Sequence, residues 1–202
     1  MNARKLMIAA ALLVSCITAQ AQTQFGIKGG FSASWIVGTV LNGDEVVSPH
    51  NNFYAGATAS WEIGDIFTLQ TELLYAGKGH SDRSTLLNKK YTRTLGYLQL
   101  PVMFGVRLAD DRCTLMLGPE PGYLVYAYKN DYGVESSGKE ECNPFNLAAA
   151  FQVTYMIIDA VGIDAKFDWG LTKTFSDKYR GIVDDPGHNM SFQIGVCFKF
   201  GD

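Results

Sequence analysis

A one-by-one alternation of apolar and polar residues constrains this chain more than any other feature of its sequence. In the first alternating segment Phe25, Ile27 and Phe31 share one parity, and glycine or polar residues share the other. Because successive side chains of a β-strand point to opposite faces, a period of two predicts a strand with one apolar and one polar face. The alternation recurs in eight segments: 24–35, 53–63, 67–78, 97–107, 115–126, 145–155, 161–171 and 189–200.

The connections between these segments alternate in length. Four are long and polar, at 38–51, 79–90, 129–143 and 173–188, and three are short, at 64–65, 108–111 and 156–160. In an antiparallel up-and-down sheet, every long connection then lies at one end. The pattern predicts an all-β fold, an eight-stranded antiparallel up-and-down β-barrel, with residues 22–202 as one domain.

The two faces of the predicted strands distinguish a membrane barrel from a soluble one. A soluble barrel such as a lipocalin holds apolar residues inside and charges outside. Here the apolar parity carries no charge, and the polar parity is rich in glycine, serine and threonine, which suits a narrow interior. The apolar parity therefore faces lipid, and the sequence predicts a transmembrane β-barrel.

Aromatic residues of the apolar parity fall into two bands. Placing the segments by direction puts Trp35, Phe53, Tyr75, Tyr123, Phe145 and Trp169 near the long connections. It puts Phe25, Trp61, Phe67, Tyr155 and Phe200 near the short ones. Two aromatic bands are typical of the two interfaces of a bilayer.

The polar parity carries charges of both signs in equal number. Eight strands leave a lumen that side chains can fill, and buried charges must be paired. We therefore expect a plugged lumen crossed by salt bridges rather than an open pore. The charged residues are Lys28, Lys78, Arg107, Lys166 and Lys199, with Glu62, Glu72, Glu120, Asp164 and Asp168. The same parity rule places Tyr126 on the inner face.

Residues 1–21 have the composition of a secretory signal peptide. A short basic start precedes an apolar run, and Ala19-Gln20-Ala21 fits a signal-peptidase site. We expect Sec export, cleavage near Ala21 and insertion in the bacterial outer membrane. The stretch 13–16 also fits a lipoprotein cleavage box, which would leave a lipidated Cys16, and this alternative stays open.

Charge and composition exclude several functional classes. Without residues 1–21, the chain has 15 basic and 20 acidic residues, and no basic stripe of the kind that binds nucleic acid. No apolar run beyond them approaches the ~18 residues of a spanning helix. No glycine-rich phosphate motif precedes a helix, so we expect no cofactor.

The last alternating segment carries a second pattern. Gln193, Gly195, Phe198 and Phe200 follow the order polar-x-Gly-x-x-aromatic-x-aromatic. This order resembles the C-terminal β-signal that the outer-membrane barrel-assembly machinery reads. We therefore expect that machinery to be a partner of the chain.

Four stretches together resemble the PorT-type outer-membrane β-barrel family of Bacteroidetes-like bacteria. They are FGIKGG at 25–30, YLQLPV at 97–102, LGP at 117–119 and GVCFKF at 195–200. The resemblance implies an eight-stranded barrel in a family whose members mostly have no assigned function. The namesake of the family assists a protein-secretion system.

Three histidines are the candidates for chemistry at the barrel rim. His50, His80 and His188 each fall where a long connection meets a strand, and Ser81 and Asp82 lie beside His80. A histidine with a serine and a carboxylate would suit a lipid-modifying hydrolase or acyltransferase, and three histidines would suit a metal site. Their wide separation in sequence favours the simpler interpretation, in which polar loops merely contain histidines.

Together these features predict a non-enzymatic integral outer-membrane barrel with no catalytic, cofactor or metal site. Its loops would contact extracellular ligands, lipopolysaccharide or a protein partner in the envelope, as an accessory to secretion or envelope assembly. The alternatives are a lipid-modifying enzyme at the rim and a narrow channel.

Overall fold

The computed structural model describes residues 23–37, 46–84, 89–109, 111–131, 134–176 and 187–200. The predicted signal peptide, Cys16 and most of the connection at 173–188 lie outside the described residues. No helix within the described ranges is long and apolar enough to cross a membrane.

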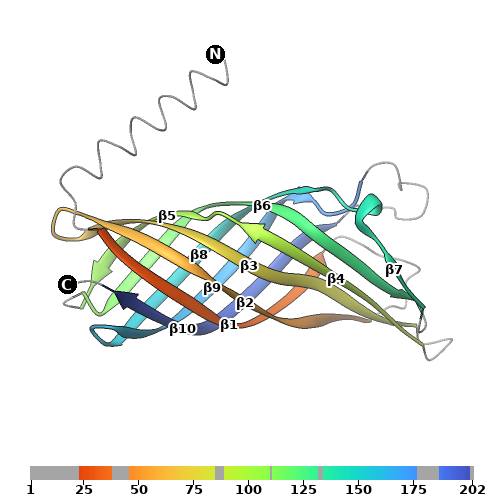
Figure 1. The fold of residues 1–202 in the computed structure, drawn as a ribbon, viewed down its shortest axis with the longest axis horizontal. Coiled ribbons are helices and arrows are strands. Elements are labelled where there is room, and N and C mark those ends of the chain that lie inside the picture. The colour runs from red at the N-terminus through yellow and green to blue at the C-terminus, as the bar shows by residue number, and fades with distance from the viewer. Residues whose placement is uncertain are drawn as a thin grey trace, which may run out of the picture.

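The chain forms one closed antiparallel barrel of eight strands, which confirms the predicted fold (Figure 1). β1 pairs with both β2 and β10, and this pairing closes the sheet. β4 and β5 are two halves of one barrel strand, because both lie between β3 and β6 and only Leu100 and Pro101 separate them. The strands are β1 (Thr23–Val37), β2 (Val46–Ile63), β3 (Phe67–Ser84), β4 (Lys89–Gln99), β5 (Val102–Leu108), β6 (Cys113–Asp131), β8 (Phe145–Ile158), β9 (Val161–Lys173) and β10 (His188–Phe200).

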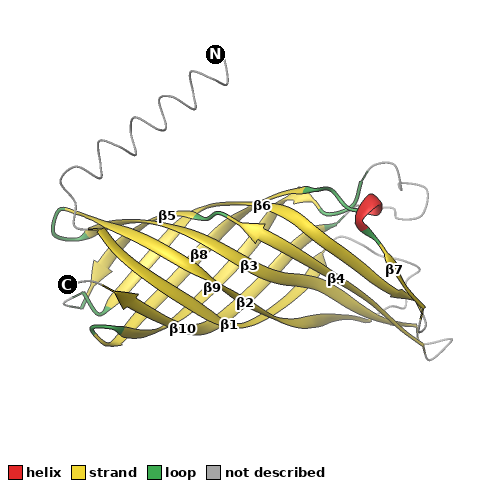
Figure 2. Cartoon of the chain, in the orientation of Figure 1, coloured by secondary structure: helices red, strands yellow, loops and turns green. Residues whose placement is uncertain are grey.

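The strands extend further toward the long connections than the alternation predicts. β3 continues to Ser84, β4 begins at Lys89 and β2 begins at Val46, so parts of the predicted loops are strand. The predicted loop at 129–143 contains β7 (Val134–Ser137), which pairs with β6, and the short helix η1 (Lys139–Glu141) (Figure 2). A hairpin outside the bilayer has no face that contacts lipid, so its strands need not alternate apolar and polar residues. The sequence alternation therefore does not reveal these strands.

The inner and outer faces agree with the predicted parities. Phe25 and Leu117 are 60% and 62% exposed on the outer face, whereas Lys166 and Asp168 are fully buried. Outer aromatic rings meet at both ends of the barrel. At one end the ring centres of Phe53 and Tyr75 are 5.3 Å apart. At the other end the ring centres of Phe67 and Phe104 are 5.6 Å apart.

The inner position predicted for Tyr126 is wrong. Gly96 pairs with Tyr126 but Tyr97 pairs with Leu124, so Val125 is an extra residue in β6. Such a bulge shifts the parity of the residues that follow it. Tyr126 therefore points outward, where its hydroxyl hydrogen-bonds that of Tyr75.

Candidate functional site

Seven charged side chains fill the middle of the lumen, and we call this group the ionic layer. Each of these side chains is at most 1% exposed. A buried charge is tolerated only when it is paired and hydrogen-bonded, so the contacts of the layer decide whether the barrel can fold. The layer consists of Lys28, Glu72, Lys78, Glu120, Asp164, Lys166 and Asp168.

Each lysine of the ionic layer lies between two or more carboxylates. Lys28 Nζ is 2.8 Å from Glu72 and 3.3 Å from Asp164. Lys78 Nζ is 3.3 Å from Glu120 and 3.2 Å from Asp168.

Lys166 joins the two halves of the ionic layer. Its Nζ is 2.6 Å from Glu120 Oε2 and 3.8 Å from Glu72 Oε2. It is also 3.9 Å from Asp168 Oδ1. The layer is thus one connected network rather than separate ion pairs.

Neutral polar side chains complete the ionic layer. The Tyr54 hydroxyl donates to Asp164 Oδ1 at 2.8 Å, and Lys28 Nζ donates to Gln152 Oε1 at 2.9 Å. Ser191 donates to Asp168 Oδ2 at 2.6 Å, and Gln193 Nε2 donates to the same oxygen at 3.3 Å. Tyr54 therefore satisfies an Asp164 oxygen that no lysine reaches, whereas Ser191 and Gln193 share Asp168 Oδ2 with Lys78.

An apolar cluster lies on the long-connection side of the ionic layer, and we call it the apolar layer. Its members are Ile36, Leu95, Tyr97, Leu124, Ala127, Cys142 and Phe175. Cys142 and Phe175 come from connecting segments that meet in an isolated bridge. Asn143 Nδ2 holds this segment by donating to the carbonyls of Lys173 and Phe175, at 2.9 and 3.1 Å. Two connections thus meet at this end of the barrel.

A small ionic cluster lies above the apolar layer. Glu141 accepts hydrogen bonds from Arg93 and, at 2.6 Å, from Lys129. Partial burial would raise the pKa of Glu141, but the two cations hold it below its ordinary value. The Arg93 guanidinium also lies 4.8 Å from the centre of the Phe175 ring. The cluster therefore clamps η1 onto the apolar layer.

The three candidate histidines lie on different strands. His50 Nε2, on β2, is 3.1 Å from Thr94 Oγ1, a contact that contains neither a serine nor a carboxylate. His188 Nδ1, on β10, is buried and has no hydrogen-bond partner among the described residues. The backbone of His80 lies opposite Pro49 and Arg93, and its side chain lies outside the description.

Ser81 and Asp82 follow His80 on β3. Ser81 is buried and lies opposite Ser48 and Thr92, whereas the side chain of Asp82 lies outside the description. No group of three or more His, Cys, Asp or Glu residues in the described part of the chain could hold a metal ion. Because the side chains of His80 and Asp82 lie outside the description, the enzyme hypothesis stays a prediction.

The residues of the predicted β-signal have distinct positions on β10. Gln193 points into the ionic layer, whereas Phe198 and Phe200 are exposed on the outer face. A Cβ atom on Gly195 would lie 2.3 Å from the Gly29 carbonyl oxygen and 2.5 Å from the Tyr54 hydroxyl. Glycine at this position therefore leaves space for Tyr54, a structural role that the sequence pattern alone does not reveal.

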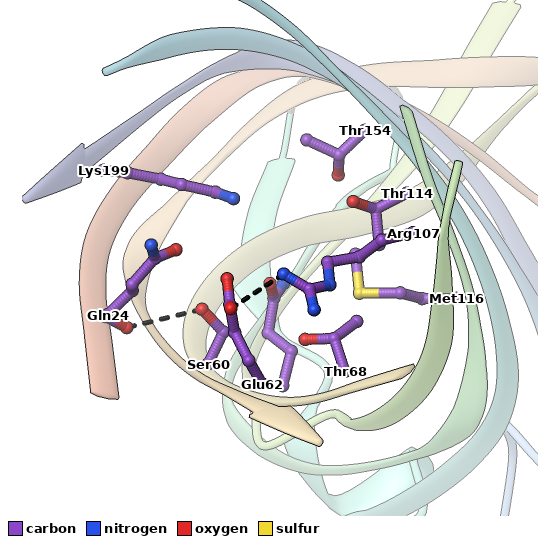
Figure 3. A pocket seen from close by; sticks show the side chains of 10 residues that line it. Gln24, Ser60, Glu62, Thr68, Arg107, Thr114, Met116, Thr154 and Lys199 are labelled. Atoms are coloured by element: carbon purple, nitrogen blue, oxygen red, sulfur yellow. Dashed lines mark hydrogen bonds and ion pairs between the residues drawn. The ribbon is translucent and has the colours of Figure 1, made fainter. Parts of the chain in front are cut away.

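A polar cavity lies inside the barrel at the short-turn end (Figure 3). Lys199 of β10 and Arg107 of β5 enter it from opposite walls. Arg107 pairs with Glu62 at 2.8 Å and donates to the carbonyls of Gly64 and Asp65. The cavity of about 20 Å³ has room for about one water molecule.

Comparisons with known proteins agree on the fold. A family model described as "Outer membrane protein beta-barrel domain" matches residues 18–176. No curated protein matches the chain.

Two solved structures share the fold of the barrel at low sequence identity. Neisserial surface protein A is 14% identical, with a TM-score of 0.58 over 87% of this chain and 97% of that one. The attachment invasion locus protein Ail of Yersinia pestis is 15% identical, with a TM-score of 0.52 over 89% and 99%. At these identities the likeness concerns the fold alone.

Proposed function

Because this chain belongs to the family of outer membrane protein β-barrel domains, we propose that it is a non-enzymatic barrel with a plugged lumen that acts through its extracellular end. The protein lies in the bacterial outer membrane. Short turns of such barrels face the periplasm and long loops face the outside. The apolar layer, η1 and the Arg93–Lys129–Glu141 cluster are accordingly at the extracellular end.

The observation that carries this proposal is the filling of the lumen by two successive layers. The ionic layer occupies the middle with paired side chains, and the apolar layer lies above it. An ion on its way through would have to displace paired charges and then leave water for an apolar region, and both steps are costly. A channel function is therefore disfavoured, and the remaining places for function are the two ends.

The extracellular end carries hairpins that are available for contacts. The β3–β4 hairpin and the β6–β7 hairpin carry paired strands beyond the predicted bilayer segments. The names of the two structural neighbours describe a surface protein and an attachment invasion locus protein, which agrees with a role at the cell surface. We propose that these hairpins contact lipopolysaccharide, an extracellular ligand or an envelope protein.

The finer assignments rest on the sequence. The PorT-type resemblance supports an accessory role in secretion or envelope assembly. The Gln193–Phe200 pattern on β10 supports insertion by the barrel-assembly machinery, and the outward Phe198 and Phe200 rings are accessible from the lipid side for that recognition.

The proposed function can be tested by purifying the protein from native outer membrane in mild detergent. We expect lipopolysaccharide or one envelope protein to remain bound in fixed proportion. A double variant Arg93→Gln and Lys129→Gln should reduce this retention, because it releases the clamp that holds η1 at the extracellular end. The control Lys199→Gln, at the periplasmic mouth, should retain it. Equal retention by all three proteins, or none by the natural protein, would contradict the proposal.

A further inference from the structure

The ionic layer contains more acids than bases. Its three lysines face four carboxyl groups, so it would carry one net negative charge if every group were ionised. Tyr54 and Cys197 also face it, as neutral groups. Glu62, Arg107 and Lys199 line the periplasmic mouth cavity, where Arg107 is paired with Glu62 and solvent screens the half-buried Lys199.

Several buried polar atoms in and beside the ionic layer have no partner: four are carboxylate or amide oxygens, and one is the hydroxyl of Ser32, which lies opposite Gln193. Among the described residues, Glu72 Oε2, Asp168 Oδ1, Gln99 Oε1 and Gln193 Oε1 accept no hydrogen bond. Lys166 Nζ lies 3.8 and 3.9 Å from the first two, beyond hydrogen-bond reach. The donors of the layer therefore do not reach these two carboxylate oxygens, and its formal charge is one short of neutral.

Asp168 and Gln193 show how a single proton would both donate a hydrogen bond to an unpartnered oxygen and neutralise the excess negative charge. Gln193 Nε2 already donates to Asp168 Oδ2 at 3.3 Å, and the unpartnered oxygens are the second oxygen of each group. A carboxylic acid and an amide pair through two hydrogen bonds when the acid O–H donates to the amide oxygen. Water could donate to these oxygens too, but it would leave the buried negative charge uncompensated.

We propose that the ionic layer is a binding site for one proton, which keeps one of its carboxyl groups neutral at neutral pH. The proton is shared by the carboxyls around Lys166, namely Glu72, Glu120 and Asp168, because strongly interacting groups titrate as one unit. Asp164 lies outside this group, since both its oxygens already accept hydrogen bonds, from Tyr54 and Lys28. This inference goes beyond the proposed function and does not depend on it.

The periplasmic mouth provides a route for this proton. Gln70 lines the mouth cavity, and its Nε2 donates to Glu72 Oε1 at 2.6 Å. One side chain thus separates the cavity from the first carboxyl of the layer, so the proton can equilibrate with the periplasm rather than with the cell exterior.

Infrared spectroscopy of the barrel in lipid vesicles tests the proposal directly. We expect a protonated-carboxyl band at neutral pH that shifts in D₂O and disappears in Asp168→Asn or Glu120→Gln. These substitutions make the layer neutral without a proton. Glu141→Gln, outside the layer, should leave the band unchanged. Absence of the band from the natural protein would overturn the proposal even if no variant folds.

Unfolding by urea in vesicles gives a second measurement. Between the ordinary carboxyl pKa of about 4 and the pKa of the shared proton in the folded chain, the folded chain would hold one more proton than the unfolded chain, so stability falls as pH rises through this window. The unfolding equilibrium constant should then rise about tenfold per pH unit. Asp168→Asn should remove this dependence. A pH-independent constant that instead falls with added Na⁺, and not with a bulky organic cation, would show a bound metal ion and overturn the proposal.

Discussion

The two layers inside the barrel differ in where their residues come from. The ionic layer consists only of strand residues, and the residues before and after each of them on the same strand, glycines apart, point to the outer face. The apolar layer combines strand residues with Cys142 and Phe175 from the connections. Lipid on one side of a strand thus dictates the inner residues through parity, whereas the connections join the apolar layer through tertiary contacts that parity does not describe.

The largest effect should follow from removing one base of the ionic layer. Lys166→Met leaves Glu72, Glu120 and Asp168 without the cation that joins them. Breaking a buried ion pair on one side typically costs 3–5 kcal/mol, so we expect a loss of about 4 kcal/mol in the free energy of unfolding. Urea unfolding in lipid vesicles measures it. The control Lys139→Met, at the extracellular end, should change stability by less than about 0.5 kcal/mol.

Truncating the apolar layer should destabilise the barrel somewhat less. Phe175→Ala removes a buried ring that packs against Arg93 and the apolar layer, which should cost about 3 kcal/mol. The comparison is Phe151→Ala, whose ring lies on the lipid face and leaves no cavity in the lumen. A larger loss for Phe151→Ala would mean that the apolar layer is not packed as described.

A smaller effect should separate packing from assembly on β10. Gly195→Ala brings a methyl group against the Gly29 carbonyl and Tyr54, and overpacking of this kind should cost about 2 kcal/mol in purified protein. Phe200→Ala, on the outer face, should fold in vesicles with little loss but insert poorly in cells. If Phe200→Ala inserts in cells like the natural chain, the β-signal assignment is wrong.

The smallest effect concerns the cluster above the apolar layer. Arg93 and Lys129 hold the pKa of Glu141 below its ordinary value. The ion pairs of Glu141 therefore stabilise the fold fully at pH values above about 4.3, the ordinary pKa of a glutamate. That contribution is lost as pH falls through the lowered value. Glu141→Gln should abolish this acid sensitivity and cost under about 1 kcal/mol at neutral pH. Parallel pH profiles for the two proteins would contradict the clamp.

The comparison also shows what could be predicted from the sequence. The strands and the charges of the ionic layer follow from parity, since a residue beside a lipid-facing one must point inward. The partners within the layer do not, because Lys28 meets Asp164 across 136 positions of sequence, through the closure of the barrel. Tyr126 could not be placed either, because the bulge at Val125 has no signature in residue type.

The part of the apolar layer outside the predicted segments was missed for a related reason. Leu95 and Phe175 lie in segments where no lipid face imposes alternation, so their burial depends on how the connections fold. Parity describes the segment inside the bilayer and says nothing beyond it. The candidate residues His50, His80 and His188 fall in this outer region, which is why their surroundings could not be predicted.

Single-channel recording in planar lipid bilayers tests the central claim, that side chains close the lumen, most directly. The natural protein should show no stable ionic current. Phe175→Ala should also show none, because the ionic layer below the truncated apolar layer still blocks the lumen. A steady current through the natural protein would contradict the account. A current that appears only in Phe175→Ala would assign the closure to the apolar layer alone.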